Sequence, residues 1–233
     1  IKAFDILDDG SLLVQLDNKT VVSRLLNQRH EVLNSTLADG NLTKIINSSL
    51  FTIGYTNKTL NFYNYPDGNY LNSIFLNNPA QDVEIFNNFI LTVSFGSNQI
   101  KFWNLNTFQN EVSINFTIGT VWGLKLKLFD GFTLAVALSN NSILIYNLNL
   151  MRFNKSLQGH TKRIRGFEYV SCNNRLLSIS EDKTLKVWNP YGASPISLQT
   201  LTFTLEPTSF QNLNSDCKLS YLLLFLKILN KIK

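Results

Sequence analysis

The sequence predicts an all-β protein that is built from about five repeats of four short antiparallel strands. A five-residue pattern recurs along the chain: apolar, any residue, apolar, aromatic, Asn. It occurs at 60–64, 100–104, 143–147 and 185–189, and its aromatic positions lie 40, 43 and 42 residues apart. Apolar residues alternate within each copy, which is the period of a strand and not of a helix. A near-constant interval of this length is typical of proteins that stack one supersecondary unit on the next.

Each copy of the pattern follows a second apolar segment, and a polar turn separates the two. The apolar segments are 50–53, 90–93, 134–138 and 176–179, and the turns lie at Asn57, Ser97, Asn140 and Asp182. Asn and Asp are favoured in turns because they bond their own backbone. A weaker copy at 21–25 predicts one further repeat near the start of the chain. Four short strands in about 40 residues is the pattern of one blade of a β-propeller.

The repeats divide residues 1–204 into five predicted blades, and a further segment follows them. The blades are expected at 1–37, 38–77, 78–116, 117–158 and 159–204. Residues 205–233 are expected to be either the start of a sixth blade or a non-native C-terminal tail. The tail also has apolar residues and lysines that would suit an amphipathic contact with a membrane surface. Its apolar run at 221–226 is far shorter than the roughly 20 residues that cross a membrane.

The last repeat carries the most specific motif of the chain. It contains Gly159-His160, then Asp182 in a turn, then Trp188-Asn189 at the end of the five-residue pattern. These marks resemble the repeats of the WD-repeat β-propeller family, and the resemblance covers nearly all of the chain up to about Phe203. The other repeats lack the Gly-His pair and the turn Asp, and two of them have Tyr where the family has Trp.

The resemblance implies a structural tetrad of His160, Ser178, Asp182 and Trp188. Ser178 lies ten residues before Trp188, where the family places a strand hydroxyl. In such a blade Asp182 accepts a hydrogen bond from His160, His160 contacts Ser178, and Ser178 contacts the indole N–H of Trp188. The same Asp, His and Ser could be considered a nucleophilic triad. No strained GxSxG turn surrounds Ser178, so the structural role is favoured.

The resemblance also implies a partner-binding face, because the loop that begins with Gly-His opens where partners commonly dock. The expected binding residues are Thr43, Glu84, Trp122 and Arg165 as one position repeated in four blades, with Lys162 and Arg163 in the loop and Tyr55 and Phe95 at the ends of second strands. Trp122 is equally compatible with packing against a neighbouring blade. For Arg165 simple solvation is the alternative, and for Tyr55 and Phe95 core packing is favoured.

Composition points away from most enzymatic classes. The sequence has two histidines and no CxxC, so we expect no metal site. No paired carboxylates or phosphate-binding loop can be placed, and we expect neither a cofactor nor catalysis. The net charge of +5 is scattered, which does not favour nucleic-acid binding.

We therefore expect a cytoplasmic scaffold that binds other proteins within a multiprotein complex. One alternative is the substrate receptor of a ubiquitin ligase, although the WD-x-Arg element of many such receptors is absent. Ribosome assembly is another alternative, which the basic net charge supports weakly. A lipid-binding propeller is a third, but the sequence has no Phe-Arg-Arg-Gly motif.

Overall fold

The computed structural model describes eight parts of the chain. They are residues 3–6, 12–15, 21–24, 40–47, 50–55, 58–64, 69–116 and 123–205, with side chains described for 58–64, 69–116 and 125–205. Two compact units are distinguished, Ile1–Thr120 and Val121–Lys233, and each is considered by itself. Trp122 and the predicted sixth blade or tail after residue 205 lie outside the described residues.

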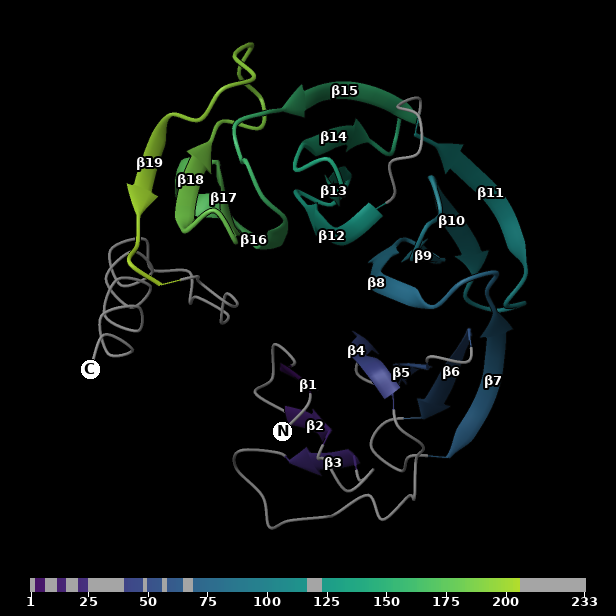
Figure 1. The fold of residues 1–233 in the computed structure, drawn as a ribbon. Helices are drawn as coiled ribbons and strands as arrows, with labels where there is room; N and C mark the ends of the chain where they lie inside the picture. Colours follow the sequence, from purple (N-terminus) through teal and green to yellow (C-terminus); the bar gives the residue numbers. More distant parts are fainter. Residues whose placement is uncertain are drawn as a thin grey trace. The chain divides into compact units, whose positions relative to one another are not determined.

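The first unit contains three antiparallel sheets among its described residues, and each sheet follows chain order (Figure 1). One sheet has three strands, β1 (Ala3–Ile6), β2 (Leu12–Gln15) and β3 (Val21–Arg24). The second has β4 (Gly40–Asn47), β5 (Leu50–Tyr55), β6 (Thr59–Asn64) and β7 (Tyr70–Phe75). The third has β8 (Ala80–Phe86), β9 (Phe89–Ser94), β10 (Gln99–Asn104) and β11 (Asn110–Asn115).

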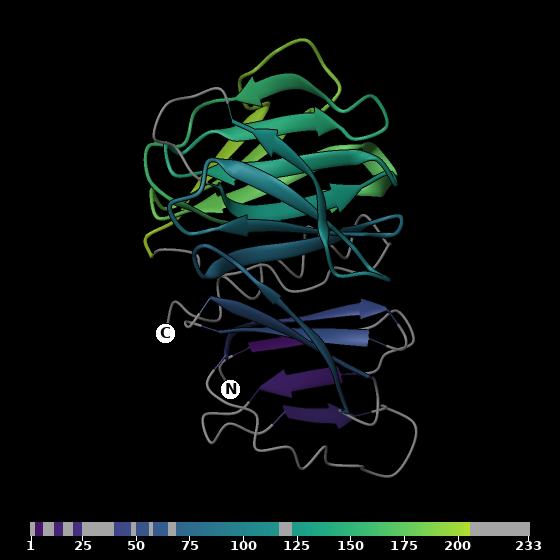
Figure 2. The same ribbon diagram turned by 90° about the vertical axis from the view of Figure 1, so that its right-hand side faces the viewer.

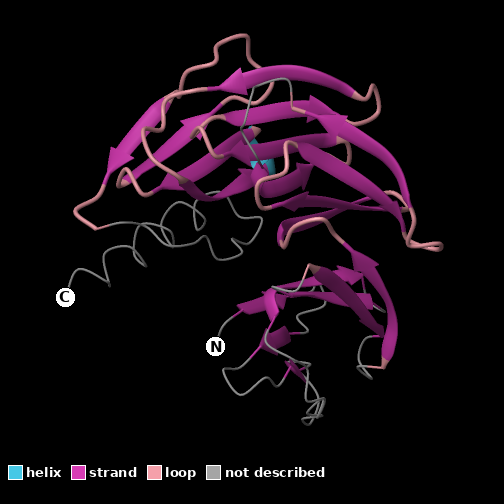
Figure 3. Ribbon diagram, turned by 45° about the vertical axis from the view of Figure 1, so that its right-hand side comes forward, coloured by secondary structure: helices cyan, strands magenta, loops and turns pink. Residues whose placement is uncertain are grey.

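The second unit contains two four-stranded antiparallel sheets in its described part. The first is formed by β12 (Gly123–Phe129), β13 (Thr133–Leu138), β14 (Ile143–Asn147) and β15 (Arg152–Leu157). The second is formed by β16 (Ile164–Val170), β17 (Arg175–Ser180), β18 (Thr184–Trp188) and β19 (Gln199–Thr202). A single 3-10 turn, Ser171–Asn173, joins β16 to β17, and Figure 3 shows strands and short loops elsewhere in the described chain. The predicted all-β fold of four-stranded antiparallel sheets is confirmed for these residues.

The five-residue pattern forms the third strand of each four-stranded sheet, and its aromatic residue has the same register in all of them. The backbone partners are Tyr63 with Phe51, Trp103 with Ile90, Tyr146 with Leu134, and Trp188 with Leu176. The weaker copy at 21–25 likewise overlaps β3, the third strand of its sheet. The repeat in the sequence is therefore a repeat of strand pairing.

The two tryptophans of the pattern lie in apolar cores that adjoining sheets share within one unit. Trp188 belongs to a buried cluster with Ile145 and Leu157, from the neighbouring β12–β15 sheet. In Figure 2 the teal β12–β15 sheet and the green β16–β19 sheet lie against one another, and β12 adjoins β16. Trp103 belongs to a second cluster with Phe62 of the β4–β7 sheet. Large aromatic rings supply much of the buried area in such cores. Trp103 and Trp188 therefore each hold their own sheet to the one before it.

The Asn at the end of the pattern starts the turn that leads to the fourth strand. The side-chain oxygen of Asn104 accepts hydrogen bonds from the backbone N–H of Asn106 and Thr107. Asn147 accepts from the N–H of Leu150, and Asn189 from that of Tyr191. These are Asx turns, in which a side chain takes the place of a backbone carbonyl. The repeated Asn is thus explained by local backbone chemistry.

Candidate functional site

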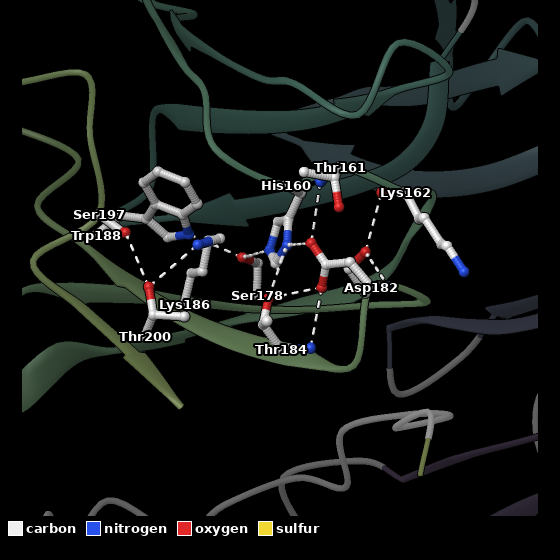
Figure 4. A network of polar contacts seen from close by, with 11 residues as sticks. His160, Thr161, Lys162, Ser178, Asp182, Thr184, Lys186, Trp188, Ser197 and Thr200 are labelled. Carbon is white, nitrogen blue, oxygen red and sulfur yellow. Dashed lines mark hydrogen bonds and ion pairs between the residues drawn. The ribbon is translucent and has the colours of Figure 1, made fainter. Parts of the chain in front are cut away.

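The Gly-His loop brings an imidazole beneath the hairpin between β17 and β18. Gly159 has a φ of +148°, a backbone conformation that favours glycine, and a Cβ atom there would lie 3.5 Å from the Trp188 ring. The next residue, His160, is buried, and its ring meets the Trp188 ring edge-on at a centroid distance of 5.9 Å. The positive φ of Gly159 therefore lets the chain turn so that His160 is inserted beside Trp188. Figure 4 shows the His160 ring between Ser178 and Asp182.

A chain of three hydrogen bonds joins the four residues of the expected tetrad. The Trp188 indole nitrogen lies 2.8 Å from Ser178 Oγ, Ser178 Oγ lies 2.7 Å from His160 Nε2, and His160 Nδ1 lies 2.8 Å from Asp182 Oδ2. An ionised carboxylate can only accept, so Nδ1 carries the proton that it donates to Asp182. Nε2 of the neutral ring then accepts from the Ser178 hydroxyl, whose oxygen accepts from the indole. Every bond in the chain runs in one direction, from Trp188 to Asp182.

The network extends to residues that the sequence did not single out. Asp182 also accepts from the backbone N–H groups of Thr161 and Thr184, at 3.0 and 2.9 Å, and from the Thr184 hydroxyl at 2.6 Å. Ser180 Oγ accepts from the Asp182 N–H at 3.1 Å and donates to the carbonyl oxygen of Lys162 at 2.9 Å. The turn chemistry of Asp182 could have indicated Thr184, two residues on. The result is that the hairpin holds the loop after His160 through the side chains of Asp182 and Ser180.

Burial and hydrogen bonding set the protonation states of the central pair. Burial raises the pKa of the Asp182 carboxyl, but hydrogen bonds from Thr184, His160 and the Thr161 N–H outweigh it and lower the pKa from 3.8 to about 2. Burial lowers the pKa of His160 below 6.5, and Asp182 opposes that shift only in part. At neutral pH the pair is therefore an ionised Asp182 and a neutral His160.

The burial of this network limits what it can do chemically. Ser178 is 0% exposed, and the His160 side chain is also out of contact with solvent. A nucleophile must reach its substrate, and this hydroxyl is enclosed between an indole and an imidazole. Within the described residues no group of three or more His, Cys, Asp or Glu side chains is placed to hold a metal ion. The geometry fixes a loop to a sheet.

The β8–β11 sheet has one part of the same network, the buried hydrogen bond between the tryptophan indole and a strand hydroxyl. The Trp103 indole N–H donates to Thr92 Oγ1 at 2.9 Å, and both groups are buried. By strand register Thr92 is equivalent to Ser178, since each lies two residues beyond the partner of its tryptophan. The turn between β9 and β10 is one residue longer than that between β17 and β18, so Thr92 lies eleven residues before Trp103 and the spacing of ten missed it. A search for a hydroxyl side chain two residues beyond the strand partner of each tryptophan would have identified Thr92.

The β12–β15 sheet has the other part of the network, the hydrogen bonds that the turn residue makes between the second and third strands. Asn140 Oδ1 accepts from the backbone N–H and the hydroxyl of Ser142, at 3.1 and 2.7 Å. Asp182 makes the same two contacts with Thr184. An amide oxygen can thus serve the turn without a carboxylate. Of the three sheets whose side chains are described from the second to the third strand (β8–β11, β12–β15 and β16–β19), the last one alone combines the indole–hydroxyl bond with the turn contacts, because it has the histidine that bridges them.

The register corrects the expected ring of partner-binding positions. Arg165 lies in a β-bulge between Ile164 and Gly166, and a bulge recurs at the same place in the first strand of the other four-stranded sheets. The residues in these bulges are Asn41, Gln81, Leu124 and Arg165. Thr43 and Glu84 instead pair in mid-strand with Ile53 and Leu91, so they are not equivalent to Arg165. The expected equivalence of these positions was wrong, since Thr43 lies two residues and Glu84 three residues beyond the bulge of its sheet, and no residue type in the sequence marks a bulge. Partner binding by these residues stays a prediction.

The other expected binding residues have different surroundings. Lys162 and Arg163 are exposed in the loop, and Arg165 is 45% exposed and forms an ion pair of 2.8 Å with Glu181. Phe95 is 55% exposed, directly after β9, so the favoured interpretation of core packing was wrong for it. Tyr55 ends β5, but its side chain lies outside the described residues, as does all of Trp122.

Comparison with known proteins supports the fold and leaves the family open. No family model matches the chain, and no curated protein matches it. Among solved structures, the computationally designed Ika8 protein has a similar fold, with a TM-score of 0.70 and 14% sequence identity. The similarity covers 90% of this chain, which spans 64% of the length of the designed chain. At that identity the likeness shows the fold alone. No helix in the described part of the chain has the length and apolarity that a membrane span requires.

Replacing Asp182 by Ala should lower the free energy of unfolding by roughly 1–3 kcal/mol, because four donors lose their acceptor and three of them are partly buried. Chemical denaturation of the purified chain measures this loss. The matched control is Glu181→Ala at the adjacent position, where an ion pair at the surface is removed and the expected loss is below about 1 kcal/mol. Equal losses in the two variants would contradict a structural role for the network.

Acid should destabilise the protein through both members of the central pair. The pKa of His160 and that of Asp182 are both lower in the folded state than in the unfolded state, so the unfolded state binds the extra proton. Stability is therefore fully present above pH 6.5 for His160, and falls as the pH drops below that value. A second loss follows between 3.8 and about 2 for Asp182.

The pH dependence can be assigned by comparing the wild type with His160→Gln. Denaturation at about pH 7.5 and about pH 5 should show a larger loss of unfolding free energy in the wild type than in the variant. Both proteins retain His30, so its contribution cancels. Parallel losses in the two proteins would show that His160 is not held neutral.

The bond between Thr92 and Trp103 should also contribute to stability. Thr92→Val keeps the shape of the side chain but leaves a buried indole N–H without an acceptor, which should cost roughly 1–3 kcal/mol. In a Trp103→Phe background no N–H remains, and the same substitution should cost less. A double-mutant cycle from denaturation curves measures the difference. No coupling between the two positions would contradict this bond.

Proposed function

We propose that the chain is a WD-repeat β-propeller and acts as a scaffold that binds other proteins. On this proposal partners bind at the end of the sheets where the loop after His160 lies, which is named here the loop end. The repeated strand register, the marker aromatic residues and the tetrad of the β16–β19 sheet support this assignment, and the likeness to the designed protein supports the fold. On this proposal each four-stranded sheet is one blade, and the blades are arranged as a ring around a central axis.

The observation that carries the scaffold function is the way in which the loop after His160 is held. The carbonyl oxygen of Lys162 accepts from Ser180, that of Arg163 accepts from the Glu181 N–H at 3.0 Å, and the Thr161 N–H donates to Asp182. Hydrogen bonds to the β17–β18 hairpin thus hold the backbone of residues 161–163, while the side chains of Lys162 and Arg163 remain exposed. A surface that is already ordered loses little entropy when a partner binds, which is the advantage of a scaffold.

The same geometry favours binding over catalysis in this sheet. The groups that could act as base and nucleophile, His160 and Ser178, are buried and already bonded to each other and to their neighbours. The exposed charged side chains at this end of the sheet are those of Lys162, Arg163, Arg165 and Lys183. We propose accordingly that the network supports the surface and takes no part in a reaction.

Affinity capture from the native cell, read by mass spectrometry, tests the proposal. The test bait carries Arg163→Ala and Arg165→Ala at the loop end, and the control bait carries Arg152→Ala and Arg175→Ala at the first residues of β15 and β17, toward the opposite end of the strands. We expect proteins that wild type and control bind to be lost from the test bait. Equal recovery by all three folded baits would contradict binding through the loop end.

A further inference from the structure

Charge at the loop end of the β16–β19 sheet is unevenly balanced. Four exposed cations gather in two adjacent segments and are named here the basic loop end: Lys162, Arg163, Arg165 and Lys183. Two acids lie among them, Glu181 and Asp182. The Asp182 side chain is only 6% exposed and accepts four hydrogen bonds, so its charge is directed into the protein. The Glu181 side chain is 26% exposed and is paired with Arg165.

Three of the four cations therefore have no acid of their own. In the described part of the chain no carboxylate lies within ion-pair distance of Lys162, Arg163 or Lys183. Arg165 donates to Glu181 through one nitrogen, Nη2, and remains nearly half exposed. A guanidinium has five N–H donors, so most of those on Arg165 are still available to a second acceptor.

The backbone positions of these cations are fixed before any partner arrives. Lys183 has a φ of +64° at the tip of the hairpin, its N–H donates to the Ser180 carbonyl at 3.1 Å, and its carbonyl accepts from the Phe203 N–H at 2.7 Å. The Lys162 and Arg163 carbonyls are bound to the same hairpin. The buried side chain of Ile164 anchors the loop between Arg163 and Arg165. Positive charge is thus held in one place by a rigid frame.

We propose that the basic loop end binds an acidic segment of a partner protein, one in which several Asp or Glu side chains lie close together. The inference rests on the proposed scaffold function and specifies the kind of partner. Charge complementarity of this kind steers association and selects the partner. A single-stranded nucleic acid is the weaker alternative, because it is bound along an extended groove with aromatic rings for base stacking. The basic loop end is compact and contains no aromatic residue.

The test uses the full chain and a fluorescently labelled glutamate-rich peptide, with the matching glutamine-rich peptide as the uncharged probe. The test variant is Arg163→Glu with Lys183→Glu. Its control is Arg152→Glu with Lys58→Glu, which changes the net charge equally. Lys58 is well matched to Lys183, since each has a positive φ and directly precedes the third strand of its sheet.

We expect fluorescence anisotropy to show binding of the glutamate peptide but not of the glutamine peptide. The test variant should weaken that binding by about tenfold or more, the control should leave it within about twofold, and added salt should weaken it in the wild type. Thermal unfolding first confirms that both variants are folded. Equal binding of the two peptides, or equal loss in the two variants, would overturn the proposal.

A labelled single-stranded DNA of mixed sequence provides the last comparison. Tighter binding of the DNA than of the peptide, with loss in the test variant alone, would overturn the acidic protein segment in favour of nucleic acid. The capture experiment separates this inference from the scaffold function. If captured proteins depend on the loop end while the glutamate peptide does not bind, the scaffold stands and the acidic partner is wrong. If neither result is obtained, both are wrong.

Discussion

Burying the Asp182 carboxylate obliges the surrounding chain to supply it with donors, and the arrangement of the β16–β19 sheet follows from how they are supplied. Two backbone N–H groups, a hydroxyl and an imidazole converge on it. The imidazole in turn needs a donor for its second nitrogen, and Ser178 provides it. The indole of Trp188 finds its acceptor in the same hydroxyl. Buried polar groups are expensive when unpaired, so the four side chains depend on one another.

The other sheets meet the same constraint with fewer groups. Trp103 needs an acceptor for its N–H and has Thr92. Leu76 lies four residues before β8, as His160 lies four residues before β16, and it joins the apolar cluster around Trp103. Asn140 serves its turn as a neutral amide and requires no imidazole. In these two sheets the tryptophan indole and the turn amide each have a hydrogen-bond partner. The repeats thus meet the same local requirements with different polar groups.

Much of this architecture could be predicted because it depends on spacing that strand geometry fixes. The third strands and the positions of His160, Asp182 and Trp188 follow from a period of two within strands and of about 40 between repeats. Thr92 was missed because one additional turn residue changes the count without changing the register. The ring through Thr43 and Glu84 was placed wrongly because the bulge at Arg165 and its equivalents is a property of backbone pairing, with no residue type that marks it. The ion pair between Arg165 and Glu181 depends on a bulged residue of β16 meeting the turn after β17, which composition does not reveal.

The Asx turns that end three of the five-residue patterns have a consequence for how the protein responds to its medium. Asn104, Asn147 and Asn189 hold their turns with uncharged amides, so the ions in solution have little to screen there. The exposed lysines and arginines around residue 163 are fully subject to that screening. Ionic strength therefore adjusts the attraction of this surface for charged molecules, whereas the three amide turns at the ends of the third strands keep their hydrogen bonds. Salt thus acts on the binding of charged molecules without acting on these turns.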